Sequence, residues 1–359
     1  MKKLLVILTA VLVLAGLFSG CQLMQANKKS STLVGVVMPT KSLQRWNQDG
    51  EHMQKKLEEK GYEVDLQYAE NDVATQVEQL ENMITKGCKV LVIASIDGGA
   101  LGGVLDKAAK EGIKVIAYDR LLMNTENVDY YATFDNYGVG ALQGQYIIDA
   151  LGLADGEKGP FNLEVFGGSP DDNNAYFFNA GAMDLLNPYI ESGVLIVNSG
   201  QTDMQQIAIP KWDPATAQDR MQNLLTAYYA DKNIDVVLSP NDSIAQGVVA
   251  ALKAAGYGSA SKPYPVLTGQ DCDKINVKMM IAGEQSMSVF KDTRTLAAQV
   301  VDMVDAILKG EEVPVNDTET YDNGVKVVPS YLCLPVFGSA DNYKELLIES
   351  GYYTEDDLK

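Results

Sequence analysis

Short apolar runs alternate with longer amphipathic segments along most of the chain. Between the runs, apolar side chains recur every three or four residues; the segment 73–86, for example, begins behind Asp72, a good helix N-cap, and stops at Gly87. Such alternation predicts an α/β fold with parallel sheets and right-handed crossovers. The apolar runs, which read as buried parallel strands, occupy residues 33–38, 64–68, 90–94, 114–118, 130–134, 162–166, 194–197, 235–238, 265–268 and 287–290.

The number of predicted strands argues for two sheets. A single sheet of roughly ten strands would be unusual, and about five strand–helix units fall in each half of the chain. A chain of 359 residues is also long enough for two domains that each bury a core. We therefore expect two doubly wound parallel-sheet lobes. No Pro- or Ser-rich linker separates the halves, so the connection between them should be short.

The first residues have the features of an export signal. Two lysines precede an apolar run at residues 4–17, which is too short to span a membrane comfortably. The small pair before Cys21 resembles a bacterial lipobox, in which this cysteine is lipidated, although Phe18 stands where leucine is usual. We expect a lipoprotein signal peptide at residues 1–20 and a flexible leader at 21–32, which tethers the protein to the extracytoplasmic face of a membrane. Ordinary secretion is the alternative.

The charge balance argues against nucleic acid as a partner. The chain has 29 Lys and Arg against 48 Asp and Glu, a net charge of −19, and lacks the basic footprint that phosphates require. Beyond Cys21, the cysteines are Cys88, Cys272 and Cys333, at no metal-like spacing. Cys88 is expected to be a small core residue, and a single disulfide stays open.

The sequence offers little of the machinery of an enzyme. Its only histidine, His52, lies on the amphipathic segment 44–60 and is expected to face solvent. There is no Gly-x-Ser-x-Gly elbow and no histidine cluster for a metal. Paired aspartates can hydrolyse glycosides, but carboxylates paired with Arg or Lys suit accepting hydrogen bonds better than donating protons. We expect no catalysis, no cofactor and no metal.

Polar residues cluster after several predicted strands, and the two tryptophans of the chain lie beside them. Ligands of open α/β sheets bind at the carboxyl ends of strands. Two flat indoles within a ring of Asp, Asn, Arg and Lys suit a sugar, which has apolar faces and a hydroxyl-bearing edge. These positions are Lys41 to Trp46, Asp119-Arg120, Asp172-Asn173-Asn174, Trp212, Asn241-Asp242, Gly269-Gln270-Asp271 and Lys291.

In this order and spacing, the clusters resemble those of the periplasmic monosaccharide-binding proteins of ABC importers. Within that family the chain is most similar to the xylose-binding and multiple-sugar-binding (ChvE-like) group, from Leu33 to nearly the C-terminus. Each cluster alone is weak evidence, but the ordered set is highly specific. The resemblance rests on Arg45-Trp46, Tyr118-Asp119-Arg120, Gly167-Gly168-Ser169-Pro170 with Asp172-Asn173-Asn174-Ala175, Asn241-Asp242, Gly269-Gln270-Asp271 and Phe290-Lys291-Asp292.

The resemblance implies the type I periplasmic-binding fold, in which the chain crosses a hinge several times. The crossings are expected near residues 134–137, 290–291 and 331–334. The lobes would then be an N-lobe of residues 33–136 completed by 291–332, and a C-lobe of residues 137–290 completed by 333–359.

The resemblance also implies which residues contact the sugar. The carboxylates of Asp119, Asp172 and Asp271 would be balanced by cationic side chains around a neutral ligand, and the two indoles would stack on its faces. The implied set is Lys41, Arg45, Trp46, Asp119, Arg120, Asp172, Asn174, Trp212, Asn241, Asp271 and Lys291.

By the same resemblance, the protein is a monomer that closes on an aldose such as xylose, glucose, galactose or arabinose. It would deliver the sugar to the transmembrane subunits of an ABC permease. A sugar sensor that feeds a chemotaxis or two-component membrane receptor is the alternative. Asp171 adds a further acceptor near the sugar rim and favours a broad aldose binder over a strict xylose binder.

Several of these residues also have a purely structural interpretation. The tryptophans can be ordinary half-buried aromatics, and Asp119-Arg120 can be a solvated strand end. Asn174 can be a helix cap, and Asp242 is expected to be one. In Asp271-Cys272-Asp273, the two carboxylates read as a site residue and a cap.

Overall fold

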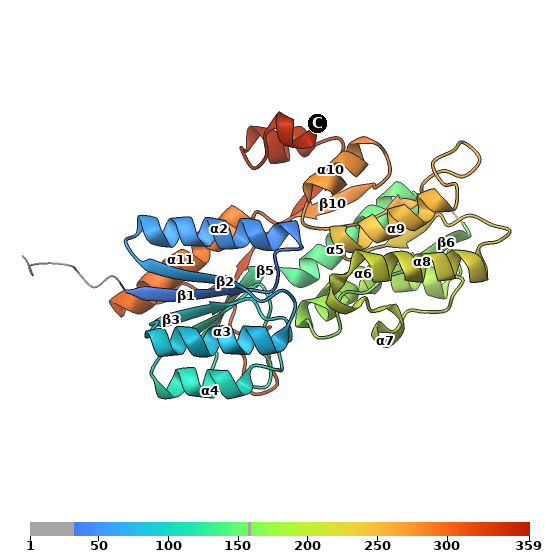
Figure 1. Ribbon diagram of the computed structural model, residues 1–359. Helices are drawn as coiled ribbons and strands as arrows, with labels where there is room; N and C mark the ends of the chain where they lie inside the picture. The colour runs from blue at the N-terminus through green and yellow to red at the C-terminus, as the bar shows by residue number, and fades with distance from the viewer. Residues whose placement is uncertain (1–31, 157–158) are drawn as a thin grey trace, which may run out of the picture.

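The computed structural model describes residues 32–156 and 159–359, so the expected signal peptide and lipidation residue Cys21 lie outside the described residues. Two α/β lobes lie side by side (Figure 1). Both are built on sheets whose central strands are parallel, which confirms the predicted fold class.

The first lobe contains a six-stranded parallel sheet with the order β11-β5-β4-β3-β1-β2. Its strands are β1 (Leu33–Met38), β2 (Glu63–Tyr68), β3 (Val90–Ile93), β4 (Lys114–Tyr118), β5 (Tyr130–Phe134) and β11 (Ser330–Cys333). Figure 1 shows α2 and α11 on one face and α3 and α4 on the other. These helices are α2 (Gln44–Glu59), α3 (Val73–Lys86), α4 (Gly102–Lys110) and α11 (Thr293–Lys309).

Helix α3 shows how local sequence sets the ends of an element. The side chain of Asp72 accepts a hydrogen bond from the backbone N–H of Thr75 at 2.7 Å, as expected of an N-cap. Gly87 ends the helix with φ of +84°, a conformation that glycine adopts without a steric penalty. Leu80 and Met83 are fully buried against the sheet, so the predicted apolar face is the packed face.

The second lobe has a parallel sheet with the order β7-β6-β8-β9 and an antiparallel pair, β10 with β12. Its strands are β6 (Phe161–Val165), β7 (Leu195–Val197), β8 (Val236–Leu238), β9 (Val266–Leu267), β10 (Met287–Phe290) and β12 (Val336–Ser339). Its helices are α5 (Asn136–Ala150), α6 (Asn173–Glu191), α7 (Met204–Ile207), α8 (Pro214–Tyr228), α9 (Asp242–Ala254) and α10 (Lys274–Ile281).

The pairing of β10 corrects one expectation. Residues 287–290 were expected to be one more parallel strand, but β10 makes only an isolated parallel bridge to the β9 side, between Gln270 and Val289. Its ladder is formed with β12, antiparallel. The reason is topological, because the chain returns to the second lobe after β11 and covers the free edge of β10.

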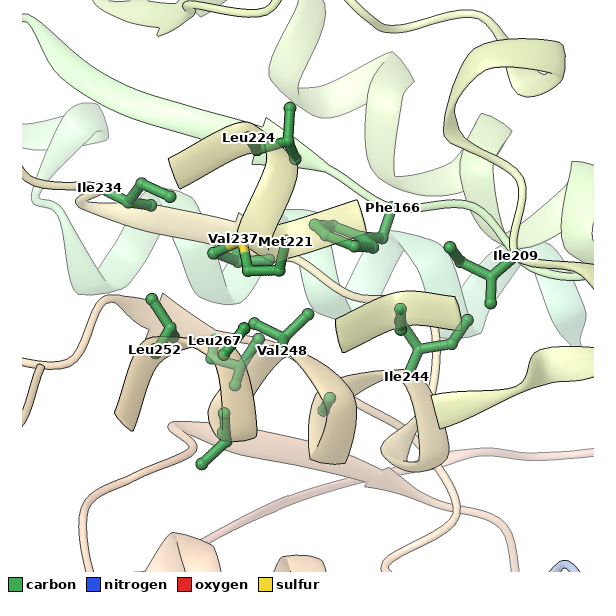
Figure 2. Close-up of a cluster of buried hydrophobic side chains, with 14 of the residues drawn as sticks. Phe166, Ile209, Met221, Leu224, Ile234, Val237, Ile244, Val248, Leu252 and Leu267 are labelled. Atoms are coloured by element: carbon green, nitrogen blue, oxygen red, sulfur yellow. The ribbon is translucent and has the colours of Figure 1, made fainter. Parts of the chain in front are cut away.

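Each lobe buries its own core. In the second lobe, Met221 and Leu224 of α8 and Val248 and Leu252 of α9 belong to one buried cluster with sheet residues such as Val237, and Figure 2 shows Met221 beside Val237. Helices α5 and α6 approach so closely that a Cβ on Gly140 would lie 2.0 Å from the Phe178 carbonyl oxygen. Both lobes therefore present rigid strand ends to the space between them.

The chain passes between the lobes three times, after β5, after β10 and after β11. Behind β12 it forms a π-helical turn at Lys344–Glu349 and a short 3-10 helix at Glu355–Leu358, which lies against α10. Among the described residues no helix is both long and apolar enough to cross a membrane. Cys88, Cys272 and Cys333 are buried free thiols, so the open question of a disulfide among these three is answered.

Candidate functional site

A pocket lies between the lobes, at the carboxyl ends of strands from both sheets. Its empty space, mouth included, measures about 450 Å³, a size typical of small-ligand sites. This is the position at which open α/β sheets bind ligands. The pocket is lined by Leu43, Arg45, Trp46, Asp119, Arg120, Asp172, Asn174, Phe178, Trp212, Asn241, Ser243, Gln270, Asp271, Asp273 and Lys291.

Arg45 is the central cation of the pocket. It lies in the first turn of α2, and its Nε contacts Oδ2 of Asp49, one helical turn away, at 3.0 Å. Its Nη2 forms a very short ion pair with Asp119, and its Nη1 lies 3.4 Å from Oδ1 of Asp271 in the second lobe. Asp49 in turn accepts a short hydrogen bond from the hydroxyl of Tyr118. Arg45 is therefore fixed by three carboxylates and joins the two lobes.

Asp119 follows β4 directly and has a φ of +58°, which is unusual for a residue with a side chain. Its carbonyl oxygen accepts hydrogen bonds from the hydroxyls of Tyr131 at 2.6 Å and Thr133 at 3.0 Å. A third bond comes from Nδ2 of Asn174, across the lobe boundary, at 2.6 Å. These bonds hold the backbone in the conformation that places the carboxylate in the pocket.

Trp46 lies beneath two guanidinium groups. The Cζ atoms of Arg45 and Arg120 stand 4.9 Å and 5.0 Å from the centre of its ring, at cation–π distance. Arg120 also donates from Nη1 to the carbonyl of Ser95 at 3.0 Å, and its Nε lies 3.0 Å from Oδ2 of Asp172. The second ion pair between the lobes is thus Arg120 with Asp172.

Asp172 and Asn174 open helix α6 on the second lobe. Asp172 is its N-cap and accepts from the backbone N–H of Asn174 at 3.0 Å. The Oδ1 atom of Asn174 accepts from Tyr131 at 2.9 Å and from Nδ2 of Asn136 at 3.0 Å, while its Nδ2 donates to Asp119. The amide of Asn174 therefore serves the contact between the lobes as well as lining the pocket.

Trp212 forms the second aromatic wall. Its own φ of +57° and that of Lys211, +59°, turn the chain so that the indole enters the pocket. The ring packs so closely on Gly168 that a Cβ there would lie 2.0 Å from Cη2 of the indole. Phe178 meets it edge-on, with ring centres 6.2 Å apart. The buried Nε1 of Trp212 has no hydrogen-bond partner among the described residues.

Lys291 and Asp271 meet at the hinge side of the pocket. Nζ of Lys291 lies 3.1 Å from Oδ1 of Asp271, and the lysine is only 3% exposed. The ammonium also stands 5.8 Å and 5.6 Å from the ring centres of Phe134 and Phe178. A buried charge of this kind is tolerated because it is paired.

The N-cap of α9 is Asn241, whose Oδ1 accepts from the backbone N–H of Ile244 at 3.1 Å. The expectation that Asp242 caps this helix is therefore wrong. Asp242 is fully buried and accepts from the backbone N–H of Asp273 at 2.9 Å and from Nε2 of Gln285 at 2.8 Å. It holds the loop that carries Asp273 in place beneath the pocket.

The structure does not bring Lys41 to the pocket. Its side chain is exposed, and its Nζ stands 4.8 Å from the ring centre of Tyr68. It lines a separate, open hollow with residues of α2 and β2, such as Asn47 and Asp65. Lys41 precedes α2, and the loop there directs it outward, whereas Arg45 in the first helical turn points inward.

His52 also differs from expectation. It is half-buried on α2, and its Nδ1 lies 3.2 Å from Oγ1 of Thr293 at the start of α11. Burial is the main cause that lowers its pKa below the ordinary value. The ring therefore contributes to the packing of two helices of the first lobe and does not line the pocket.

Burial raises the pKa values of the carboxyl groups of the pocket, and nearby cations lower them. Burial favours a raised pKa for Asp119, but the charges of Arg45, Lys291 and Arg120 outweigh it and lower the pKa. For Asp172, burial dominates over Arg120, and the pKa is raised. The Asp119 carboxylate thus stays ionised over a wide pH range and can act as a pure acceptor.

Three further carboxyl groups have raised pKa values, with burial as the main cause in each, and that of Asp242, which lies beside Asp273, is raised well above its ordinary value. Burial raises the pKa of Asp49 to about 6 even though Arg45 opposes the shift. Burial, together with the nearby charge of Asp271, raises the pKa of Asp273 to about 7. Asp273 can therefore be protonated, and donate a hydrogen bond, at pH values where an ordinary aspartate only accepts.

A family model described as a periplasmic binding protein domain matches residues 34–312. The chain belongs to this family. The multiple sugar-binding periplasmic protein SbpA of Azospirillum brasilense is 59% identical over 326 residues, which are 91% of both chains. The multiple sugar-binding periplasmic receptor ChvE of Rhizobium radiobacter is 57% identical over 326 residues, or 91% of this chain and 92% of ChvE.

A solved structure gives the same result at the level of the fold. It is an ABC transporter solute binding protein from Clostridium phytofermentans with bound β-D-glucose. That chain is 63% identical to this one and superposes with a TM-score of 0.88. The match covers 91% of this chain and 100% of the other. The resemblance to multiple-sugar-binding proteins and the type I two-lobe fold are thereby confirmed.

The predicted set of sugar contacts left out several residues of this periplasmic binding protein that line or support the pocket, although Gln270 and Tyr118 lie within motifs that the sequence had singled out. Gln270 and Asp273 line it, and Asp49 and Tyr118 fix Arg45 from behind. The signals were weak. The four-residue spacing of Arg45 and Asp49 on a predicted helix pointed to an ion pair, but nothing in the sequence separated this pair from those on solvent-exposed helix faces.

The arrangement suits recognition of a neutral, polar molecule. The wall carries four carboxyl and three cationic side chains, most of them already paired. Buried atoms without a hydrogen-bond partner among the described residues include Oε1 of Gln270, Oδ1 of Asp273 and Nε1 of Trp212. Within residues 32–156 and 159–359, no group of three or more His, Cys, Asp or Glu is placed to hold a metal ion.

Proposed function

We propose that the protein is an extracytoplasmic substrate-binding protein that captures an aldose monosaccharide and delivers it to an ABC permease. One observation carries the proposal: a pocket of about 450 Å³ between two lobes is lined by two indoles and by paired charges, and leaves buried polar atoms unpartnered. The relatives support it, because two are named multiple sugar-binding proteins and a solved relative holds β-D-glucose.

The chemistry of the wall matches that of a pyranose. The C–H faces of the ring can pack on Trp46 and Trp212, and hydroxyls both donate and accept at the rim. Asp119, Asp172 and Asp271 accept from hydroxyls, and Arg120 and Lys291 donate to them; such bonds to charged groups are the stronger kind. In total, the proposed sugar contacts are Arg45, Trp46, Asp119, Arg120, Asp172, Asn174, Trp212, Asn241, Asp271 and Lys291.

The lobes are proposed to close on the sugar about the three crossings. The ion pairs of Arg45 with Asp271 and of Arg120 with Asp172 join side chains of different lobes, so they form only when the lobes meet. A closed pocket excludes water and strengthens each polar contact. We expect a dissociation constant on the order of micromolar, about −8 kcal/mol.

We further propose that the protein acts as a monomer and is anchored by a lipid on Cys21 to the extracytoplasmic face of the cell membrane. The apolar run at residues 4–17 and the small residues before Cys21 support this. The closed form would dock on the transmembrane subunits of the permease. Mass spectrometry of the mature N-terminus tests the anchor: a diacylglyceryl-modified Cys21 is expected, and an unmodified N-terminus contradicts it.

A sensory role is a second candidate. It is favoured by one observation, that ChvE, which is 57% identical, is named a receptor. The same closed form that docks on a permease can dock on a membrane receptor. Deleting the permease partner in cells separates the two: uptake is lost in either case, but a sugar-dependent signal persists only if the protein also feeds a receptor.

Calorimetry with a panel of sugars tests the binding function. Xylose, glucose, galactose and arabinose should each bind, because the carboxyl-rich wall offers acceptors on every side of the ring. A response to an amino acid or nucleoside but to no aldose would sink the proposal. If xylose binds while glucose and galactose fail at a hundredfold excess, only the broad specificity is wrong.

A further inference from the structure

The C-terminal segment, residues 340–359, is packed on the second lobe and reaches the first. In Figure 1 it lies over α10 at the boundary between the lobes. Its side chains join those of α10 and β10 in one apolar cluster, whose buried members are Cys272, Val277, Met280, Phe290, Leu347 and Tyr353. The salt bridge of Lys274 with Asp357 adds a polar contact to the same attachment. The segment therefore moves with the second lobe.

The hydroxyl of Tyr353 joins the two lobes. It accepts a hydrogen bond from Nε2 of Gln44 in the first lobe at 2.6 Å and donates to the carbonyl oxygen of Cys272 in the second lobe at 3.0 Å. The Oε1 atom of Gln44 also accepts from the backbone N–H of Lys274 at 3.3 Å. Tyr353 is only 3% exposed, and its bond to Cys272 is buried, whereas the bonds of Gln44 are partly buried.

Both ends of this connection adjoin pocket residues. Gln44 directly precedes Arg45, and Cys272 directly follows Asp271. Asp271 and Cys272 have φ values of +97° and +51°, in the region that residues with side chains rarely adopt. A loop in such a conformation persists only when its surroundings hold it. The hydroxyl of Tyr353 satisfies the Cys272 carbonyl and so helps to fix the loop that carries Asp271.

The neighbouring tyrosine supports the first-lobe side of the contact. The hydroxyl of Tyr352 donates to Oε1 of Gln48 at 3.2 Å. The hydroxyl oxygen of Tyr352 also lies 3.1 Å from Oγ1 of Thr293. Its ring packs edge-on against Phe290, with ring centres 4.8 Å apart. The segment thus touches α2 and α11 of the first lobe while its apolar side chains stay in the cluster of the second.

We propose that Tyr353 is a positioning residue for ligand binding, whose hydroxyl holds the first turn of α2, which carries Arg45, and the loop that carries Asp271 together in the closed form. The proposal rests on the proposed function, because the contact matters for a pocket that opens to release its ligand. Opening the lobes separates Gln44 from Cys272 and breaks at least one bond to Tyr353. The hydroxyl therefore slows release of a sugar that it never touches.

The test compares two full-length variants that each remove one tyrosine hydroxyl from the C-terminal segment. Tyr353→Phe removes the connection, whereas Tyr343→Phe changes a residue that packs on the same apolar cluster and whose hydroxyl makes no hydrogen bond to the residues that the structure describes. Stopped-flow measurement of glucose release should give dissociation about tenfold faster for Tyr353→Phe, as expected for two lost hydrogen bonds, and unchanged for Tyr343→Phe. Both variants should show a cooperative unfolding transition without sugar, which verifies that they fold.

A further variant and a measurement without sugar distinguish failure of this inference from failure of the proposed function. Gln44→Met should accelerate release to a similar extent, and the double variant with Tyr353→Phe should add little. Spin labels at Lys110→Cys and Gln222→Cys report the distance between lobes without sugar, and Tyr353→Phe should shift it toward longer values. If wild type binds no aldose, the proposed function fails while the label distances still decide this inference. Equal release rates and equal distances for Tyr353→Phe and Tyr343→Phe would overturn it.

Discussion

The two walls of the pocket are built differently, although each lies at the carboxyl edge of a parallel sheet. On the first-lobe wall, Arg45 is held by Asp49 and Asp119, so these charged groups satisfy one another before any ligand arrives. On the second-lobe wall, buried oxygens of Gln270 and Asp273 have no partner among the described residues. One wall is a preassembled network, and the other offers open positions.

This difference indicates a division of roles. A preassembled network loses little side-chain entropy when a ligand arrives, because its side chains are already ordered. Unpartnered acceptors gain a hydrogen bond only when a ligand supplies the donor, so they make an empty closed pocket costly. On the first wall, a single substitution should therefore disturb several coupled groups and change affinity strongly. On the second wall, each substitution should change affinity through the altered group alone.

The largest effect is expected from Arg45→Ala on the first wall. It removes three ion pairs and leaves buried carboxylates without a partner, so aldose binding should weaken by at least ~2 kcal/mol, while the fold survives. Calorimetry at matched sugar concentrations measures the loss. Binding within twofold of wild type would show that the charged network is not part of the site.

A smaller loss is expected from Gly168→Ala on the second wall. The added Cβ would lie 2.0 Å from the indole of Trp212, so the ring must leave its place, and binding should weaken by about 1–2 kcal/mol. Gly103→Ala is the matched control, because a Cβ there meets nothing within 4 Å. It should leave affinity unchanged. Equal affinities of both variants would show that Trp212 does not shape the pocket.

Asp273→Asn should change the pH dependence of folding stability. The pKa of Asp273 is raised from 3.8 to about 7, so the folded state binds its proton more tightly than the unfolded state does. Stability is therefore lost as pH rises through this window, by at most about 1.4 kcal/mol per pH unit from this group. Denaturant unfolding between about pH 4 and 7 should show a flatter decline for Asp273→Asn. Parallel curves for variant and wild type would contradict the assignment.

The smallest effect is expected from His52→Ala, remote from both walls. It removes the contact with Thr293 between α2 and α11, so the free energy of unfolding should fall by no more than about 1 kcal/mol. Aldose affinity should not change. Loss of binding in this variant, with Arg45→Ala still active, would place the site elsewhere and revive an enzymatic function.

The fold was largely predictable because strands buried on both faces leave continuous apolar runs. The direction of β10 was not, since a four-residue run does not reveal whether its partner is parallel. Strand β12 escaped notice because Val336 and Phe337 are its only large apolar residues and neither is fully buried. Local sequence thus fixes elements well, while pairing at sheet edges depends on where the chain returns.

Pocket-lining residues were predictable where they directly follow a strand, as Asp119 after β4 and Lys291 after β10 do. The site was not predictable where support comes from inside an element. Tyr118 belongs to β4 and Asp49 to α2, and their contact with Arg45 depends on the packing of a helix on a sheet. Lys41 entered the predicted set through resemblance alone, and the course of its loop, which sequence does not reveal, directs it away.

Tryptophan fluorescence tests the central claim most directly, because the chain has two tryptophans and both line the pocket. Every photon of indole emission therefore reports on the proposed site. Titration with glucose should produce a saturable change in emission with a midpoint on the order of micromolar, and Arg45→Ala should shift that midpoint at least about thirtyfold. A flat titration with xylose, glucose, galactose and arabinose alike, on protein whose folding is verified by its unfolding transition, would contradict the account.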